Sequence, residues 1–134
     1  MKRWILVSCV VLISAFGVLA PAGAQASTVA ATQLQSGKPV KATVSKHGQR
    51  ITYTFAATAH NHVTFQVTNF NFSEGTSQGS FTLYFYQPHS TSAYTSYDYF
   101  GNDYYDFTPP LSGTWTAELV PDGASVGSMT LTMT

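Results

Sequence analysis

Apolar and polar residues alternate with a period of two through most of this chain, and no other feature constrains its fold as strongly. Ile51, Tyr53 and Phe55 fall on one side of an extended chain, while Thr52 and Thr54 fall on the other. Successive side chains of a β-strand point to opposite faces, so this period indicates strands with one buried face. The residues expected to face inward are Ile51, Tyr53, Phe55, Val63, Phe65, Val67, Phe81, Leu83, Phe85, Trp115, Ala117, Leu119, Met129, Leu131 and Met133.

Turn-forming pairs such as His47-Gly48 and Asp122-Gly123 separate the alternating stretches. The alternation slips once, because Phe70 is out of phase with Val67, and this slip predicts a β-bulge or a bend near residues 68–69. No segment of ten or more residues in this part of the chain has helical periodicity. About eight or nine short strands at this spacing predict an all-β fold, an antiparallel β-sandwich.

The first 26 residues have the three parts of a secretory signal peptide. A basic start is followed by an apolar run and by small residues that end in Ala24-Gln25-Ala26. We therefore expect residues 1–26 to be a helical signal peptide, residues 27–36 a linker or a frayed first strand, and residues 37–134 the β-sandwich domain. The mature protein is expected to be secreted to the extracellular space and to have no membrane span. The single cysteine, Cys9, lies in the signal segment, so the domain has to fold without disulfides.

The charge content excludes some classes of function. After residue 26 the chain has four basic and six acidic residues, so it has no surplus of positive charge that would attract a polyanion. We expect no nucleic-acid binding. The domain also has no cysteine nucleophile and no H-E-x-x-H motif, and its histidines lie beside expected turns. We expect the protein not to be an enzyme and to need no cofactor, with calcium as the one exception considered below.

Residues 92–107, "SAYTSYDYFGNDYYDF", hold five of the eight tyrosines and three of the six acidic residues. One interpretation is structural, since tyrosine favours strands and stacks across them. The other is a binding surface, because a solvent-facing tyrosine offers a large rigid ring and a hydroxyl to a sugar or a partner protein. On the second interpretation, the ligand-binding residues are Tyr84, Tyr86, Tyr97, Tyr99 and Tyr104.

The three aspartates of this region also have two interpretations. Asp98, Asp103 and Asp106 are oxygen donors around Gly101, and calcium prefers six to eight oxygen ligands, so they are candidate metal ligands. Alternatively they form the polar rim of the binding surface. The segment 101–103 is expected to be the turn of a β-hairpin.

Two long stretches together resemble a known family. Leu34-x-x-Gly37 and Tyr53-x-Phe55 mark the first, and Ser112-Gly113-Thr114-Trp115-Thr116 and Gly127-Ser128 mark the second. They resemble the bacterial pre-peptidase C-terminal domain, a jelly-roll-like β-sandwich of secreted proteases and other exported proteins. Where family members carry an acidic Asp-x-Asp-Leu-Tyr strand, this chain has Ser80-Phe81-Thr82-Leu83-Tyr84, so a metal role of those acids does not carry over.

The resemblance implies a non-catalytic accessory module for surface attachment, secretion or stability of an exported enzyme. Together with the tyrosine-rich segment, it predicts attachment to extracellular polysaccharide, to the cell wall or to a secreted partner through a Tyr/Asp-rich face. The alternative is a structural or envelope protein without a small ligand, which assembles through the edges of its sheets.

Overall fold

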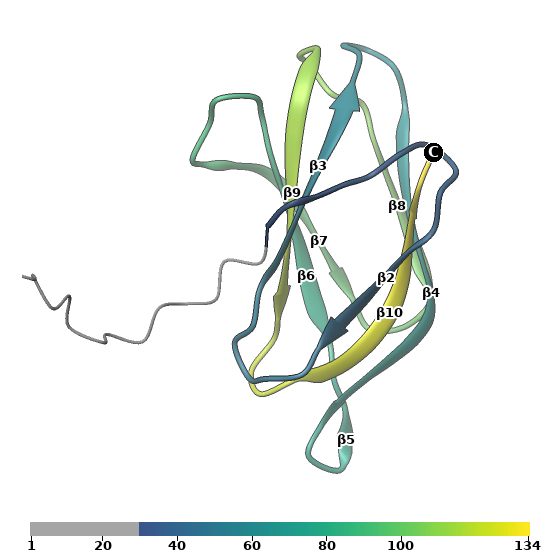
Figure 1. Ribbon diagram of the computed structural model, residues 1–134, viewed down its shortest axis with the longest axis vertical. Helices are drawn as coiled ribbons and strands as arrows, with labels where there is room; N and C mark the ends of the chain where they lie inside the picture. Colours follow the sequence, from purple (N-terminus) through teal and green to yellow (C-terminus); the bar gives the residue numbers. More distant parts are fainter. Residues whose placement is uncertain (1–29) are drawn as a thin grey trace, which may run out of the picture.

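The computed structural model describes residues 30–134, and these residues form two packed β-sheets (Figure 1). Ten strands are present: β1 (Thr32–Gln33), β2 (Val40–Val44), β3 (Ile51–Ala57), β4 (Val63–Glu74), β5 (Ser77–Gln78), β6 (Phe81–Tyr86), β7 (Ala93–Tyr99), β8 (Asp103–Phe107), β9 (Gly113–Pro121) and β10 (Val126–Met133). The prediction of an all-β sandwich is confirmed. The strand number exceeds the expected eight or nine, and two of the ten strands are only two residues long.

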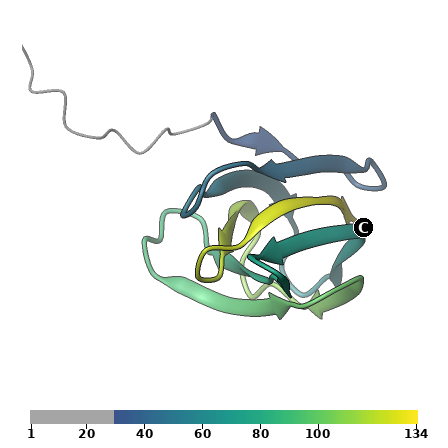
Figure 2. The same ribbon diagram turned by 90° about the horizontal axis from the view of Figure 1, so that it is seen from below.

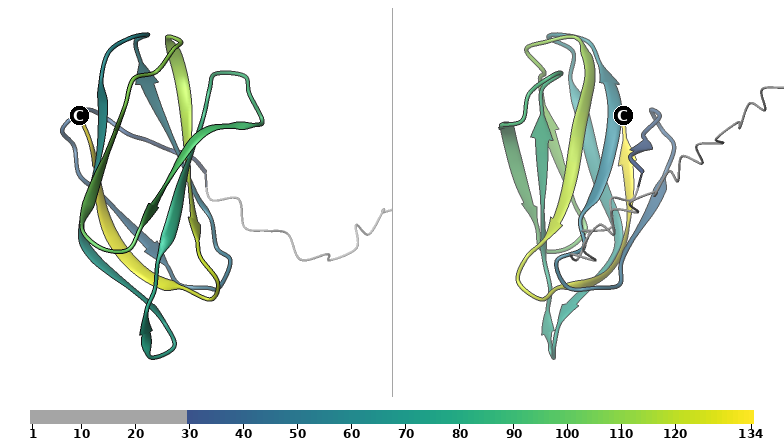
Figure 3. Two further views of the ribbon diagram at one scale, coloured as in Figure 1. Left: turned by 180° about the vertical axis from the view of Figure 1, so that it is seen from behind. Right: turned by 60° about the vertical axis from the view of Figure 1, so that its left-hand side comes forward.

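Within each sheet, strands that are distant in sequence lie next to each other. Sheet A has the order β1-β3-β9-β6-β7, and sheet B has the order β2-β10-β4-β5, with β8 paired to the other edge of β4. All pairs are antiparallel except β1 with β3. The turned views show the two layers facing each other (Figures 2 and 3), and the β4–β5 hairpin extends below them in Figure 3.

The predicted signal peptide, residues 1–26, lies outside the described residues. Within the predicted linker or first strand, Thr32 and Gln33 form β1, and the Leu34 N–H donates to the Thr54 carbonyl at 2.8 Å. Residues 30–134 contain no helix that is long and apolar enough to cross a membrane.

Aromatic rings fill the space between the sheets. Phe55, Phe85 and Trp115 come from sheet A, Phe65 and Phe107 come from sheet B, and all five are at most 8% exposed. The Phe65 ring lies 5.0 Å from Phe55 and 4.8 Å from Phe85 between centroids, so the two sheets interlock through rings. Apart from Ile51, which is half-buried, the residues predicted to face inward are buried.

The predicted slip in alternation is confirmed as a β-bulge. Opposite β4, the step from Ser128 to Thr130 on β10 spans the three-residue step from Asn71 to Thr68. The extra residue on β4 brings Asn69 to φ 52°, a left-handed conformation that asparagine tolerates. On the opposite strand, Gly127 approaches β4 so closely that a Cβ would lie 2.0 Å from the Asn71 carbonyl oxygen, so only glycine fits there.

The expected hairpin at residues 101–103 is wrong. Strand β7 pairs with β6 in sheet A, whereas β8 pairs with β4 in sheet B, so the chain crosses between the sheets at residues 100–102. The Asn102 side chain accepts from the Phe70 N–H at 3.0 Å, and the Gln78 side chain donates to the Phe100 carbonyl, which hold this crossing against β4 and β5. A glycine turn between two alternating strands has the same sequence pattern whether the two strands pair with each other or belong to different sheets.

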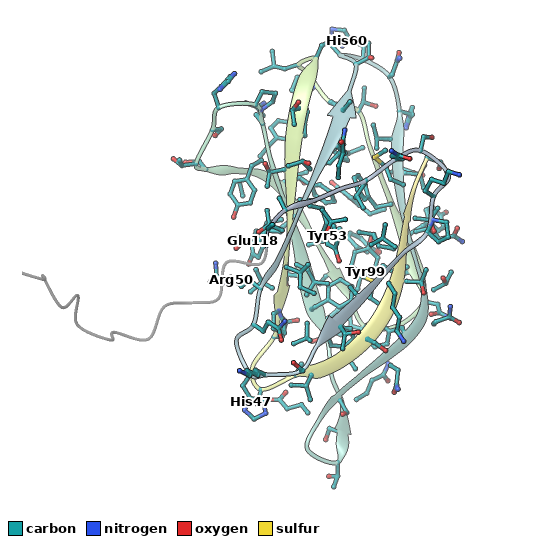
Figure 4. The ribbon with its side chains drawn as sticks, viewed as in Figure 1. His47, Arg50, Tyr53, His60, Tyr99 and Glu118 are labelled. Carbon is teal, nitrogen blue, oxygen red and sulfur yellow. The ribbon has the colours of Figure 1, made fainter. Side chains whose placement is uncertain are left out.

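The hydroxyl of Tyr53 is the one buried side-chain polar group without a hydrogen-bond partner among the described residues. Its side chain is 1% exposed and lies between the sheets, as Figure 4 shows, and burial raises its pKa. We therefore predict that Tyr53→Phe raises the free energy of unfolding by about 1 kcal/mol, because it removes an unpaired buried hydroxyl. Urea denaturation measures the change.

Tyr99→Phe is the matched control. The Tyr99 hydroxyl is buried as well, but it donates to the Phe65 carbonyl at 3.1 Å. Its loss should lower the free energy of unfolding by about 1 kcal/mol. If both substitutions destabilise the protein equally, the Tyr53 hydroxyl has a partner and this interpretation is wrong.

Candidate functional site

The five tyrosines predicted to bind a ligand lie in four different environments. Tyr84 and Tyr86 are half-buried on the outer face of sheet A, and Tyr104 is 61% exposed on the outer face of sheet B. Tyr97 lies between the two sheets at their edge, and Tyr99 is in the core. The crossing at residues 100–102 explains this distribution, because it sends the two halves of the tyrosine-rich segment to different sheets. A single Tyr/Asp-rich face is therefore not formed.

Tyr99 is a core residue rather than a surface contact. It is fully buried, its ring stacks on Phe81 at a centroid distance of 5.1 Å, and burial raises its pKa. Alternation along β7 places Tyr99 on the same side as Tyr97 and Thr95, and this side faces the interior increasingly toward the end of the strand. In this position Tyr99 has no exposed surface to offer a ligand.

Strands β7 and β8 belong to different sheets, and contacts between their side chains close one side of the sandwich. The rings of Tyr97 and Tyr105 stack with centroids 4.8 Å apart, and the Thr95 and Tyr105 hydroxyls are 2.8 Å apart. The Tyr97 hydroxyl donates to Asp103 at 2.8 Å, and this hydrogen bond raises the pKa of Tyr97. We call Thr95, Tyr97, Asp103 and Tyr105 the seam. Its tyrosines serve packing, which is the structural interpretation given to this segment.

The three aspartates do not converge on a metal position. Asp98 accepts from the Thr82 hydroxyl at 2.7 Å on sheet A, Asp103 accepts from Tyr97 in the seam, and Asp106 accepts from Thr64 on sheet B. Among residues 30–134, no three histidine, aspartate or glutamate side chains lie close enough together to hold an ion. The three carboxylates therefore have separate partners, with Asp98 on β7 of sheet A and Asp103 and Asp106 on β8 of sheet B.

The outer face of sheet A brings polar side chains of three strands into cross-strand rows. Thr52, Glu118 and Tyr84 are paired in one row, from β3 through β9 to β6. The next row contains Thr54, Thr116 and Tyr86. The alternation that buries Phe55 and Trp115 places these residues on the opposite side of the same strands.

A shallow, open depression of about 340 Å³ lies on this face. Its lining consists of Thr52, Tyr86, Ser90, Thr91, Thr116 and Glu118, and we call it the Glu118 depression. Strands β3, β6 and β9 supply four of these residues, and the loop between β6 and β7 supplies Ser90 and Thr91. That loop projects from the body of the molecule at the upper left of Figure 1.

Glu118 is the electrostatic centre of the depression. Its Oε1 accepts from Arg50 at 3.2 Å, and its Oε2 accepts from the Tyr86 hydroxyl at 3.0 Å. Figure 4 shows the Arg50 and Glu118 side chains next to each other. Burial, followed by the Glu118 hydrogen bond, raises the pKa of Tyr86. The depression thus contains an aromatic ring, hydroxyls and one carboxylate whose charge is balanced by Arg50.

Glu118 and Arg50 were not among the residues predicted from the sequence to bind a ligand. Glu118 is the only charged residue among the outward positions of β9, where Thr114 and Thr116 precede it and Val120 follows it. That isolation was visible in the sequence. Its partners were not, because Tyr86 and Arg50 are 32 and 68 positions away.

The sequence contains the pattern G-x-S-x-G twice, at 75–79 and 123–127. In hydrolases this pattern presents a serine nucleophile where a strand turns into a helix. Here Ser125 is fully buried and accepts from the Ser80 N–H at 3.2 Å, and Ser77 belongs to the two-residue strand β5. Neither serine precedes a helix in the described part of the chain, so both matches lack the structural context of a nucleophile.

Substitutions at two of the predicted ligand tyrosines test where they lie. Tyr99→Ala should lower the free energy of unfolding by about 3–5 kcal/mol, because it empties a large volume in the core. Tyr104→Ala should change it by less than about 0.5 kcal/mol, because that side chain is mostly in water. Urea denaturation of both variants measures the difference, and equal losses would contradict the assigned positions.

No protein-family model and no curated protein sequence matches this chain. Solved structures do match its fold. PliG of Aeromonas hydrophila, a periplasmic inhibitor of g-type lysozyme, aligns with a TM-score of 0.54 and 18% identity over 78% of this chain and 96% of that one.

The pre-peptidase C-terminal domain of a collagenase from Bacillus anthracis aligns with a TM-score of 0.52 and 14% identity, over 78% of this chain and 94% of that domain. At these identities the likeness concerns the fold. The resemblance to pre-peptidase C-terminal domains is thereby confirmed at the level of structure: residues 30–134 have a β-sandwich similar to that domain and to a periplasmic lysozyme inhibitor.

Proposed function

We propose that this protein is an exported, non-catalytic binding module that attaches to extracellular polysaccharide through the outer face of sheet A. The observation that carries the proposal is the Glu118 depression, with the Tyr86 ring, three threonine hydroxyls and a carboxylate around an open space. A tyrosine ring offers an apolar face to a sugar ring, and the surrounding hydroxyls hydrogen-bond to sugar hydroxyls. The open shape suits a long polymer, which has to pass across a site rather than enter it.

Tyr84 extends the same surface. It lies two residues before Tyr86 on β6 and pairs with Glu118 across the sheet, so both rings flank the carboxylate. The signal peptide expected at residues 1–26 agrees with a ligand outside the cell. The absence of catalysis is supported by the wide, shallow form of the site and by its single carboxylate, because glycoside hydrolysis ordinarily needs two.

Tyr84→Ser and Tyr86→Ser test this function. Each should weaken retention on insoluble polysaccharide by about tenfold or more, because an aromatic contact is lost while the fold is kept. Tyr104→Ser, on the outer face of sheet B, should bind as the wild type does. Binding depletion on cellulose, with circular dichroism to verify folding, makes the comparison. Loss confined to Tyr104→Ser would move the site to the other sheet.

A protein partner is the second candidate, and a neighbouring surface, which shares only the loop 87–92 with the depression, favours it. We call the loops 58–62, 87–92 and 108–112, with Tyr94, the loop end. The three loops contain no Asp, Glu, Lys or Arg. Tyr94 and Leu111 are each 48% exposed there, and both contact Trp115. Uncharged surfaces with exposed aromatic residues are typical of the centres of protein interfaces.

The likeness to a lysozyme inhibitor suggests a probe for this second candidate. If the loop end docks an enzyme of that class, the protein should slow cell-wall lysis by g-type lysozyme in a turbidity assay. Leu111→Lys should abolish the effect, since it places a charge at the centre of the contact. Unchanged lysis at a large molar excess of the wild type would reject g-type lysozyme as the partner.

A further inference from the structure

Some hydrogen-bonding groups of the Glu118 depression already have partners within the protein, and this limits which ligands the depression can bind. The single proton of the Tyr86 hydroxyl is donated to Glu118 at 3.0 Å, so toward a ligand the Tyr86 oxygen acts as an acceptor. The Ser90 hydroxyl donates to the Ser92 carbonyl at 3.0 Å and accepts from the Ser92 N–H at 3.2 Å. Among the described residues, the hydroxyls of Thr52, Thr91 and Thr116 have no such partner and are available to a ligand.

The charges of the depression cancel locally. Glu118 is the only acidic residue of the lining, and Arg50 forms an ion pair with it at 3.2 Å. The Glu118 side chain is 19% exposed and lines the depression, whereas the Arg50 side chain is 61% exposed and approaches the carboxylate from outside the lining. A ligand in the depression therefore meets a neutral pair rather than a single charge.

We propose that the Arg50–Glu118 pair makes this site selective for neutral glycans, with Arg50 and Glu118 as the residues that determine specificity. This inference rests on the proposed function. Different hydroxyls of a neutral sugar can donate to the Tyr86 oxygen and to Glu118, and others can donate to or accept from the threonine hydroxyls. A carboxylated sugar gains from Arg50 but is repelled by Glu118 at similar range, and an amino sugar faces the opposite balance.

Removal of one member of the pair should change the preferred charge of the ligand. Arg50→Gln leaves Glu118 unpaired in the lining, so the site should select positively charged amino-sugar polymers. Glu118→Gln leaves Arg50 unpaired, so the site should select carboxylated polymers, while the glutamine oxygen still accepts from Tyr86. Both variants should fold, because an ion pair with one exposed partner adds little to stability.

The experiment measures depletion of the full chain from solution by three matrices: cellulose, which is neutral, chitosan, which is cationic, and cross-linked polygalacturonate, which is anionic. Lys41→Gln is the control for Arg50→Gln, and Glu74→Gln is the control for Glu118→Gln. Each control makes the same change in net charge at a position that neither lines the depression nor belongs to the Arg50–Glu118 pair. Physiological salt limits non-specific ion exchange.

The wild type should prefer cellulose. Arg50→Gln should gain about tenfold on chitosan relative to Lys41→Gln, and Glu118→Gln should gain about tenfold on polygalacturonate relative to Glu74→Gln. If the wild type binds cellulose but the variants match their controls, the specificity inference is overturned and the proposed function stands. If the wild type binds none of the three matrices, both are overturned.

Discussion

The interlocking of aromatic rings between the two sheets is the interaction on which the rest of this structure depends. Phe65 of sheet B packs between Phe55 and Phe85 of sheet A, and Trp115 extends the cluster. Because residues 30–134 contain no cysteine, no disulfide assists this packing. Each inward ring also fixes the direction of its neighbours in sequence. The polar rows on the outer face of sheet A are thus a consequence of the core.

The crossing at residues 100–102 decides which polar residues can act together. It divides the tyrosine-rich segment between the sheets. Three of its five tyrosines join the core and the seam, while the aspartates bond separate hydroxyls. The surface best suited to a ligand forms elsewhere, where β3, β6 and β9 lie side by side. Arg50, Tyr86 and Glu118 belong to three different strands or their flanks, and sheet pairing alone brings them together.

The sequence was informative where the physics is local. Alternation identified the buried face of β3, β6, β9 and β10, and the slip at Phe70 located the bulge at Asn69. Prediction from the sequence failed for features that depend on which strands pair with each other. Nothing near Gly101 distinguishes a hairpin from a crossing between sheets, so Tyr99 was placed on the surface and three separate aspartates were grouped. Glu118 was overlooked because its partners lie on strands far away in sequence.

The most direct test of the binding surface is a titration of the isotope-labelled protein with a soluble neutral glucan oligosaccharide, followed by amide chemical shifts. Saturable shifts should concentrate at Thr52, Tyr86, Thr116 and Glu118 and along the loop 87–92. The amides around Tyr104 and Gln66 on sheet B should stay unchanged. Shifts centred on sheet B, or no saturable shifts at millimolar oligosaccharide, would contradict the assignment of the ligand surface to sheet A.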